Sequence, residues 1–207
     1  MPQLLDQEQI KYKERENEMI SHDHRSNAKN ALAEYIYEMR DKLAGPLEPY
    51  VSEADRQAFS MKLNKLEDWL YDEGEDLQKH PYVERLEDLK STGDIYLKRL
   101  REAELRPGAF ERLVCSLNRV EKATQNFASG DEAFNHFTNQ EMAQVIKYFN
   151  ETRHWCKKQM SIFQAMKPHE NPKIEVFDIN RKTESFVQAT NSILLKKKPP
   201  PHGMDLD

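Results

Sequence analysis

The chain has 207 residues, enough for one large or two small domains with a buried core. Charged residues make up 32% of it and only 6 glycines are present, a composition typical of exposed helices rather than of a β-sandwich or an α/β sheet. The net charge of −5, without a strongly basic segment, argues against a nucleic-acid partner, and no apolar run approaches the roughly 20 residues of a membrane span.

The first predicted helix is the clearest. Hydrophobic residues recur with helical spacing over residues 28–43, and the stripe ends at Gly45 and Pro46, a strong helix stop. Tyr35 belongs to this stripe and is predicted to be buried, whereas Tyr37 is predicted to face outward. Residues 3–27 are far more polar, so a helix there is expected to be largely exposed or to lean on a partner outside this chain.

The middle of the chain is predicted to form several shorter helices. One begins at the capping sequence Ser-Glu-Ala-Asp of residues 52–55 and stops near Gly74. The next begins at Pro81 and ends before Gly93. A short helix follows, and Pro107 is expected to end or kink it.

The last third of the chain is also predicted to be helical. A helix from residue 110 closes at Gly130, and a capping box at residues 138–141 starts the next one. Pro168 and Pro172 separate this helix from a final one over residues 176–194.

These elements predict an all-α fold with three parts. A long helical arm (residues 1–45) is followed by an antiparallel helix bundle (residues 46–196). The lysine–proline segment that starts at Lys196 lacks apolar periodicity, so residues 197–207 are predicted to be a disordered C-terminal tail.

Motifs for catalysis or cofactor binding are missing from the sequence. It contains no phosphate-binding loop, dinucleotide fingerprint or nucleophile elbow. His22 and His24 are two positions apart on a helix, so they face different sides and suit a solvated surface better than a metal site. Cys115 and Cys156 are predicted to be reduced, buried packing thiols. We therefore expect no enzyme activity, no cofactor and no metal, and a cytoplasmic, or cytoplasmic and nuclear, location.

The most unusual segment, residues 67–76, combines two aromatic residues with six acidic ones. The simpler interpretation is that both aromatic side chains seal a helix end against the bundle. The functional interpretation is a partner-binding tip, because aromatic residues often anchor interfaces. Its candidate residues are Trp69, Tyr71, Asp72, Glu73, Glu75 and Asp76.

Residues 29–35, which read Lys-Asn-Ala-Leu-Ala-Glu-Tyr, resemble the lid helix of the 70-kDa heat-shock superfamily. Residues 69–76, which read Trp-Leu-Tyr-Asp-Glu-Gly-Glu-Asp, resemble its large branch, the 110-kDa heat-shock proteins. The resemblance extends over roughly residues 5–200 and implies only the C-terminal helical part of that family. The family's ATPase domain, which binds ATP, and its β-sandwich precede this part.

The resemblance also implies partners. In the family, the arm and bundle embrace the ATPase domain of a 70-kDa chaperone and help release ADP, and the large proteins also hold unfolded client proteins. Asn30 matches the partner-facing asparagine of the family's arm helix, and Glu34 lies beside Ala33, where the family often has an acidic residue. Two alternatives remain: the peptide-binding lid of an ordinary 70-kDa chaperone, and a free-standing helical adaptor.

Overall fold

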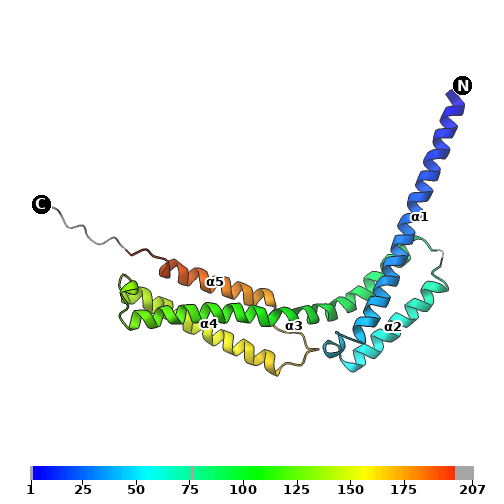
Figure 1. Cartoon of the computed structure of the whole chain (residues 1–207). Coiled ribbons are helices and arrows are strands. Elements are labelled where there is room, and N and C mark those ends of the chain that lie inside the picture. The colour runs from blue at the N-terminus through cyan, green and yellow to red at the C-terminus, as the bar shows by residue number, and fades with distance from the viewer. Residues whose placement is uncertain (1, 76, 199–207) are drawn as a thin grey trace. The chain divides into compact units, whose positions relative to one another are not determined.

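The computed structural model describes residues 2–75 and 77–198, with side chains from residue 9 onward (Figure 1). The described residues form only α-helices, two short 3₁₀ turns and connecting segments, which confirms the all-α fold class. In the described ranges, no helix is both long and apolar enough to cross a membrane. The elements in chain order are α1 (Pro2–Leu43), η1 (Glu48–Tyr50), α2 (Glu53–Tyr71), α3 (Lys79–Ala128), η2 (Glu132–Phe134), α4 (Asn139–Ala165) and α5 (Val176–Leu194).

The chain divides into two compact units, Met1–Leu100 and Arg101–Asp207. The sequence places a boundary at residue 45 instead, between arm and bundle. In the structure, the C-terminal half of α1 is part of the first unit's core, because its apolar stripe packs against α2 and α3. Of the predicted tail over residues 197–207, residues 199–207 lie outside the described residues.

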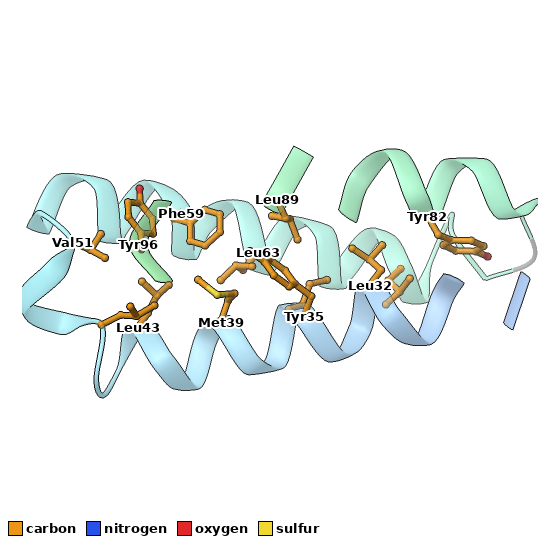
Figure 2. Packing of buried hydrophobic residues seen from close by; sticks show 13 residues of the cluster. Leu32, Tyr35, Met39, Leu43, Val51, Phe59, Leu63, Tyr82, Leu89 and Tyr96 are labelled. Atoms are coloured by element: carbon orange, nitrogen blue, oxygen red, sulfur yellow. The ribbon is translucent and has the colours of Figure 1, made fainter. Parts of the chain in front are cut away.

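The first unit is built from α1, α2 and the first part of α3 (Figure 2). Residues 9–24 of α1 are exposed, as their polarity predicts, and the buried part of the helix begins at Leu32. Tyr35 is buried and Tyr37 is exposed, which confirms both expectations. The core residues are Leu32, Tyr35, Ile36, Met39, Leu43, Leu47, Val51, Phe59, Leu63, Leu70, Tyr82, Leu89 and Tyr96.

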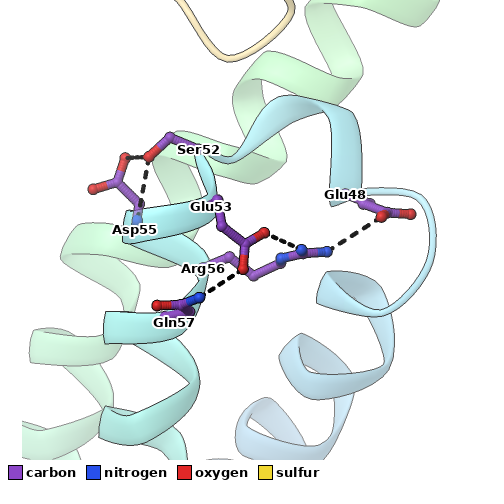
Figure 3. Close-up of polar contacts among 6 residues, drawn as sticks. All are labelled: Glu48, Ser52, Glu53, Asp55, Arg56 and Gln57. Atoms are coloured by element: carbon purple, nitrogen blue, oxygen red, sulfur yellow. Dashed lines mark hydrogen bonds and ion pairs between the residues drawn. The ribbon is translucent and has the colours of Figure 1, made fainter.

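The predicted capping sequence at the start of α2 is confirmed (Figure 3). The Ser52 hydroxyl accepts a hydrogen bond from the Asp55 backbone N–H at 3.2 Å. Arg56 links this turn to η1, because its guanidinium donates to Glu53 and, at 3.3 Å, to Glu48. These contacts fix the direction in which the chain enters α2.

The second unit is built from the rest of α3 together with α4 and α5. The capping box that starts α4 is confirmed, with hydrogen bonds in both directions between Thr138 and Glu141. Gly130 adopts a φ of 77° just after α3, which is the left-handed conformation expected at a helix C-terminus. The core residues are Ala109, Phe110, Leu113, Leu117, Val120, Val145, Phe149, Cys156, Val176, Ile179 and Phe186.

The predicted helix end before Gly93 is wrong, because α3 runs without interruption from Lys79 to Ala128, and Pro107 lies inside this helix without ending it. Gly93 serves packing instead, since a β-carbon there would collide with Tyr35. Pro107 costs the helix a backbone hydrogen bond, but Ala109 and Phe110 directly beyond it are buried in the second unit's core. Tertiary packing of this kind supplies most of a helix's stability and outweighs the local cost.

The prediction of two buried thiols holds for only one of them. Cys156 is buried, but Cys115 is exposed. Cys115 lies between Leu113 and Leu117 in sequence, two positions from each. It is therefore on the opposite face of α3, and its side chain points to solvent.

Candidate functional site

The candidate segment at the end of α2 is a tightly closed turn. The Asp72 N–H donates to the Asp68 carbonyl oxygen at 3.0 Å, and the Gly74 N–H donates to the Trp69 carbonyl oxygen at 2.7 Å. A β-carbon at position 74 would lie 2.9 Å from that same oxygen and 3.1 Å from the Trp69 ring, so the turn requires glycine. The turn fixes where the acidic residues emerge.

Trp69 closes the end of α2 against the start of α3. The central carbon of the Arg85 guanidinium lies 3.6 Å from the Trp69 ring centre, a close cation–π contact. The Tyr82 ring centre lies 6.0 Å away, and the Tyr82 hydroxyl donates to the Gly74 carbonyl oxygen. Trp69 is half-buried and packed against the core, as the simpler interpretation predicts.

Tyr71 does not seal the helix end and is 56% exposed. Its hydroxyl oxygen lies 2.8 Å from that of Tyr37, which is 41% exposed, so one hydrogen bond joins α1 to the last residue of α2. This hydrogen bond raises the pKa of Tyr37 to about 12. The raised pKa keeps the Tyr37 phenol neutral at physiological pH, and the pair presents two aromatic rings to solvent.

Arg40 of α1 holds α2 in place beside the tyrosine pair. Its guanidinium donates to the Asn64 side-chain oxygen at 3.0 Å and forms an ion pair with Glu67. The hydrogen bond from Arg40 lowers the pKa of the Glu67 carboxyl group. Because Arg40 also lies 5.9 Å from the centre of the Tyr37 ring, it holds α1, α2 and the tyrosine pair in one arrangement.

The remaining candidate residues lie on the Tyr37 face of α1 or in the acidic turn after α2. Asn30 and Glu34 are exposed and share a face of α1 with Tyr37, since they lie at positions i, i+4 and i+7. The Lys29 ammonium donates to the Glu75 carbonyl oxygen at 3.1 Å, which joins this part of α1 to the acidic turn. Asp76 lies outside the described residues. We call the following set the tyrosine surface: Asn30, Glu34, Tyr37, Tyr71, Asp72, Glu73 and Glu75.

The tyrosine surface has the features of a protein contact surface. Its titratable groups are exposed, and no group of three or more metal-ligating side chains occurs in the described part of the chain. Exposed aromatic residues bordered by carboxylates are typical of an interface that receives a basic partner surface.

Comparison with known proteins identifies the family. A family model described as HYOU1-like, C-terminal domain, matches residues 120–198. Heat shock 70 kDa protein 4 of Canis lupus familiaris and of Homo sapiens is 35% identical over 200 residues, which cover 94% of this chain. The 97 kDa heat shock protein of Strongylocentrotus purpuratus is 35% identical over 192 residues, which cover 91% of this chain. The chain is related to the C-terminal region of the large heat-shock proteins.

The match to the large heat-shock proteins confirms the resemblance on which the sequence interpretation depends. It covers 24% of the length of heat shock 70 kDa protein 4 and 22% of the 97 kDa protein, so the chain spans about a quarter of these relatives. No solved structure matches the chain.

Sequence reasoning missed the residues that hold Trp69, the tyrosine pair and the acidic turn in place, namely Lys29, Arg40, Tyr82 and Arg85. Arg85 and Arg40 act across helix–helix boundaries, on Trp69 and Glu67, and Lys29 acts from α1 on the turn that follows α2. A helical pattern shows which residues share a face of one helix, but it does not show which residue of another helix lies opposite.

Proposed function

We propose that this chain is a non-enzymatic helical region of a chaperone that grips the ATPase domain of a 70-kDa heat-shock partner. In this proposal the grip uses the tyrosine surface and the exposed part of α1, and it contributes to nucleotide exchange only together with the rest of a longer family protein. The region also helps to hold unfolded client proteins, and a cytoplasmic location belongs to the same proposal.

The exposure of α1 over residues 9–24 is the observation that carries the proposal. The apolar face of the same helix is buried from Leu32 to Leu43. A helical segment without tertiary packing is marginal in water, because packing supplies most helical stability. An arm of this kind, continuous with a firmly anchored helix, is suited to contact a second protein along its length.

The position of the tyrosine surface supports the same partner. Tyr37 and Asn30 lie on α1 directly beyond the exposed segment, and Tyr71 joins them through the hydroxyl contact. A partner that lies along the arm therefore reaches the tyrosine pair without leaving this helix. The acidic turn over residues 72–75 extends the contact and favours a basic surface on the partner.

Titration of the whole chain against the isolated ATPase domain of a 70-kDa chaperone, followed by fluorescence anisotropy, tests the proposal. Tyr71→Ala is expected to weaken binding about tenfold, as for an aromatic interface anchor. Phe177→Ala is the matched control, because Phe177 is an exposed aromatic residue of the second unit. Absence of binding would favour the free-standing adaptor, and equal effects of the two substitutions would remove the tyrosine surface from the contact.

The chain is expected to bind the partner weakly and to leave its ADP release unchanged. The relatives are about four times longer, and the family resemblance places most of the contact area in an ATPase domain outside these residues. A partial interface carries the full association cost of binding. Stopped-flow release of labelled ADP measures this, and acceleration by micromolar chain would contradict the expectation.

Nucleotide binding by the chain itself is not part of the proposal. A ligand that does not bind cannot stabilise the folded state, so ATP or ADP is expected to leave the melting temperature unchanged. A saturable rise of the melting temperature with added ATP would contradict the assignment.

A further inference from the structure

A groove between α3 and α4 in the second unit encloses a cavity of about 260 Å³. Its floor is apolar, and Leu117, Phe149 and Cys156 are nearly buried there. Met160 borders the groove and is 45% exposed. Asn118 and Glu121 form the α3 rim, and Arg153 and Lys157 form the α4 rim.

The third helix of this unit packs on a different side. Arg112 and Arg119 of α3 donate to Asn180 and Asn191 of α5, at 2.9 and 3.2 Å. On α4, Trp155 lies next to Lys182 of α5, with the ammonium 6.0 Å from the ring centre. Trp155 and the groove residue Lys157 are two positions apart, so they point to nearly opposite sides of α4. Within the described residues of the second unit, α5 therefore leaves the groove open.

The size and lining of the groove define its occupant. Small-molecule pockets usually measure about 300–1,000 Å³, so this cavity suits one or two side chains better than a whole ligand. An apolar groove between two helices is the geometry that receives the apolar face of a third, amphipathic helix. Met160 adapts such a site to its occupant, because methionine is unbranched and flexible.

The charges on the rim define the occupant further. Arg153 is neutralised by Glu121, with its Nη1 atom 3.4 Å from the Glu121 Oε1 atom. Lys157 is exposed and has no hydrogen bond or ion pair with any described residue. A free ammonium at the edge of an apolar groove favours a carboxylate beside the apolar anchors.

We propose that the α3–α4 groove binds an acidic amphipathic helix of a partner protein, with two aliphatic side chains in the cavity and a carboxylate against Lys157. The groove uses residues of the second unit only, and the tyrosine surface uses residues of the first. The chain therefore has two binding surfaces, and each can be tested without the other.

The test uses the whole chain and a fluorescein-labelled peptide, Ala-Glu-Leu-Ala-Ala-Glu-Leu-Ala-Glu-Ala, whose leucines lie one helical turn apart. Binding is followed by fluorescence anisotropy. Lys157→Glu and Met160→Glu are each expected to weaken binding about tenfold, the first by repulsion and the second by loss of apolar contact. Both residues are exposed, so both variants are expected to fold, which circular dichroism checks.

Lys158→Glu is the matched control, because it makes the same charge change one position along α4 on a residue that does not line the groove. A peptide in which lysine replaces each glutamate is expected to bind at least about tenfold more weakly. The proposal is overturned if the acidic peptide does not bind at about 1 mM, or if Lys158→Glu weakens binding as much as Lys157→Glu. It is also overturned if the groove variants abolish self-association of the chain and leave peptide binding unchanged, because the occupant is then a second copy.

Discussion

Gly93 lies directly against the phenol of Tyr35, so closely that a β-carbon at position 93 would stand 2.4 Å from the Tyr35 hydroxyl oxygen. That hydroxyl donates to the Asp94 carboxylate at 3.0 Å. Burial, together with the hydrogen bond to Asp94, raises the pKa of Tyr35. Helix α3 therefore approaches α1 closely at a position that has no side chain.

Substitution of this glycine is expected to destabilise the first unit. Gly93→Ala gains about 1 kcal/mol of helix propensity but overpacks the core, which costs about 1–3 kcal/mol, so we expect a net loss of up to about 2 kcal/mol. Gly108→Ala is the control, because the nearest atom to its added β-carbon is 3.7 Å away. It is expected to stabilise the protein by up to about 1 kcal/mol. Urea denaturation measures both, and a loss of equal size at both positions would contradict the packing role of Gly93.

Gly93 and Pro107 show why helix ends were harder to predict than helix faces. Both residues usually interrupt helices, and local sequence gives no sign that neighbouring packing compensates. The stripe over residues 28–43, by contrast, follows from a period that any amphipathic helix must have. The helix caps at Ser52 and Thr138 are equally local, and both were predicted correctly.

The candidate site was predictable in part for the same reason. Residues 67–76 stand out by composition, but the different positions of Trp69 and Tyr71 depend on contacts made elsewhere in the chain. Arg85 holds Trp69 against the core, and Tyr37 receives Tyr71 at the surface. The exposure of Cys115 is a similar case, since a residue beside an apolar stripe can point either way.

Trp69 and Tyr71 are expected to differ in what their loss changes. Trp69→Ala is expected to lower the free energy of unfolding by about 3 kcal/mol, because it removes a packed aromatic ring. Tyr71→Ala is expected to change it by about 0.5 kcal/mol or less, since the side chain is exposed. Thermal and urea unfolding measure both values. Unchanged stability of Trp69→Ala would show that this ring does not seal the helix end.

Glu141 is expected to make stability depend on pH in the acid range. The hydrogen bond from Lys196, with those from the Thr138 backbone and hydroxyl, lowers the pKa of Glu141 to about 2. Because this folded-state pKa lies below the unfolded value of about 4.3, the ionised carboxylate stabilises the fold above that value. The contribution is lost as the pH falls from about 5 towards 2.

The melting temperature of Glu141→Gln is therefore expected to be below that of the original chain at neutral pH and to converge with it near pH 2. Glu151→Gln is the control, because the Glu151 carboxylate is exposed and has no hydrogen bond with any described residue. If the difference in melting temperature between Glu141→Gln and the original chain stays constant with pH, the ionised Glu141 carboxylate is not the source of this contribution.

The two thiols are expected to react at very different rates. Cys115 is exposed, whereas burial of Cys156 raises the pKa of its thiol and lowers its thiolate fraction. With Ellman's reagent at mild alkaline pH, we expect one fast and one slow phase, the slow one at least about tenfold slower because local opening must come first. Cys115→Ser is expected to remove the fast phase. If a fast phase remains in that variant, Cys156 is accessible.

The exposed part of α1 has a consequence for amide hydrogen exchange. Its backbone hydrogen bonds over residues 9–24 are protected only by the local helix–coil equilibrium, whereas those from Leu32 to Leu43 open only when the core of the first unit opens. One continuous helix is thus expected to show a steep gradient of deuterium uptake along its length. A partner that lies along the arm would flatten this gradient, so exchange of residues 9–24 would report its arrival without any label on either protein.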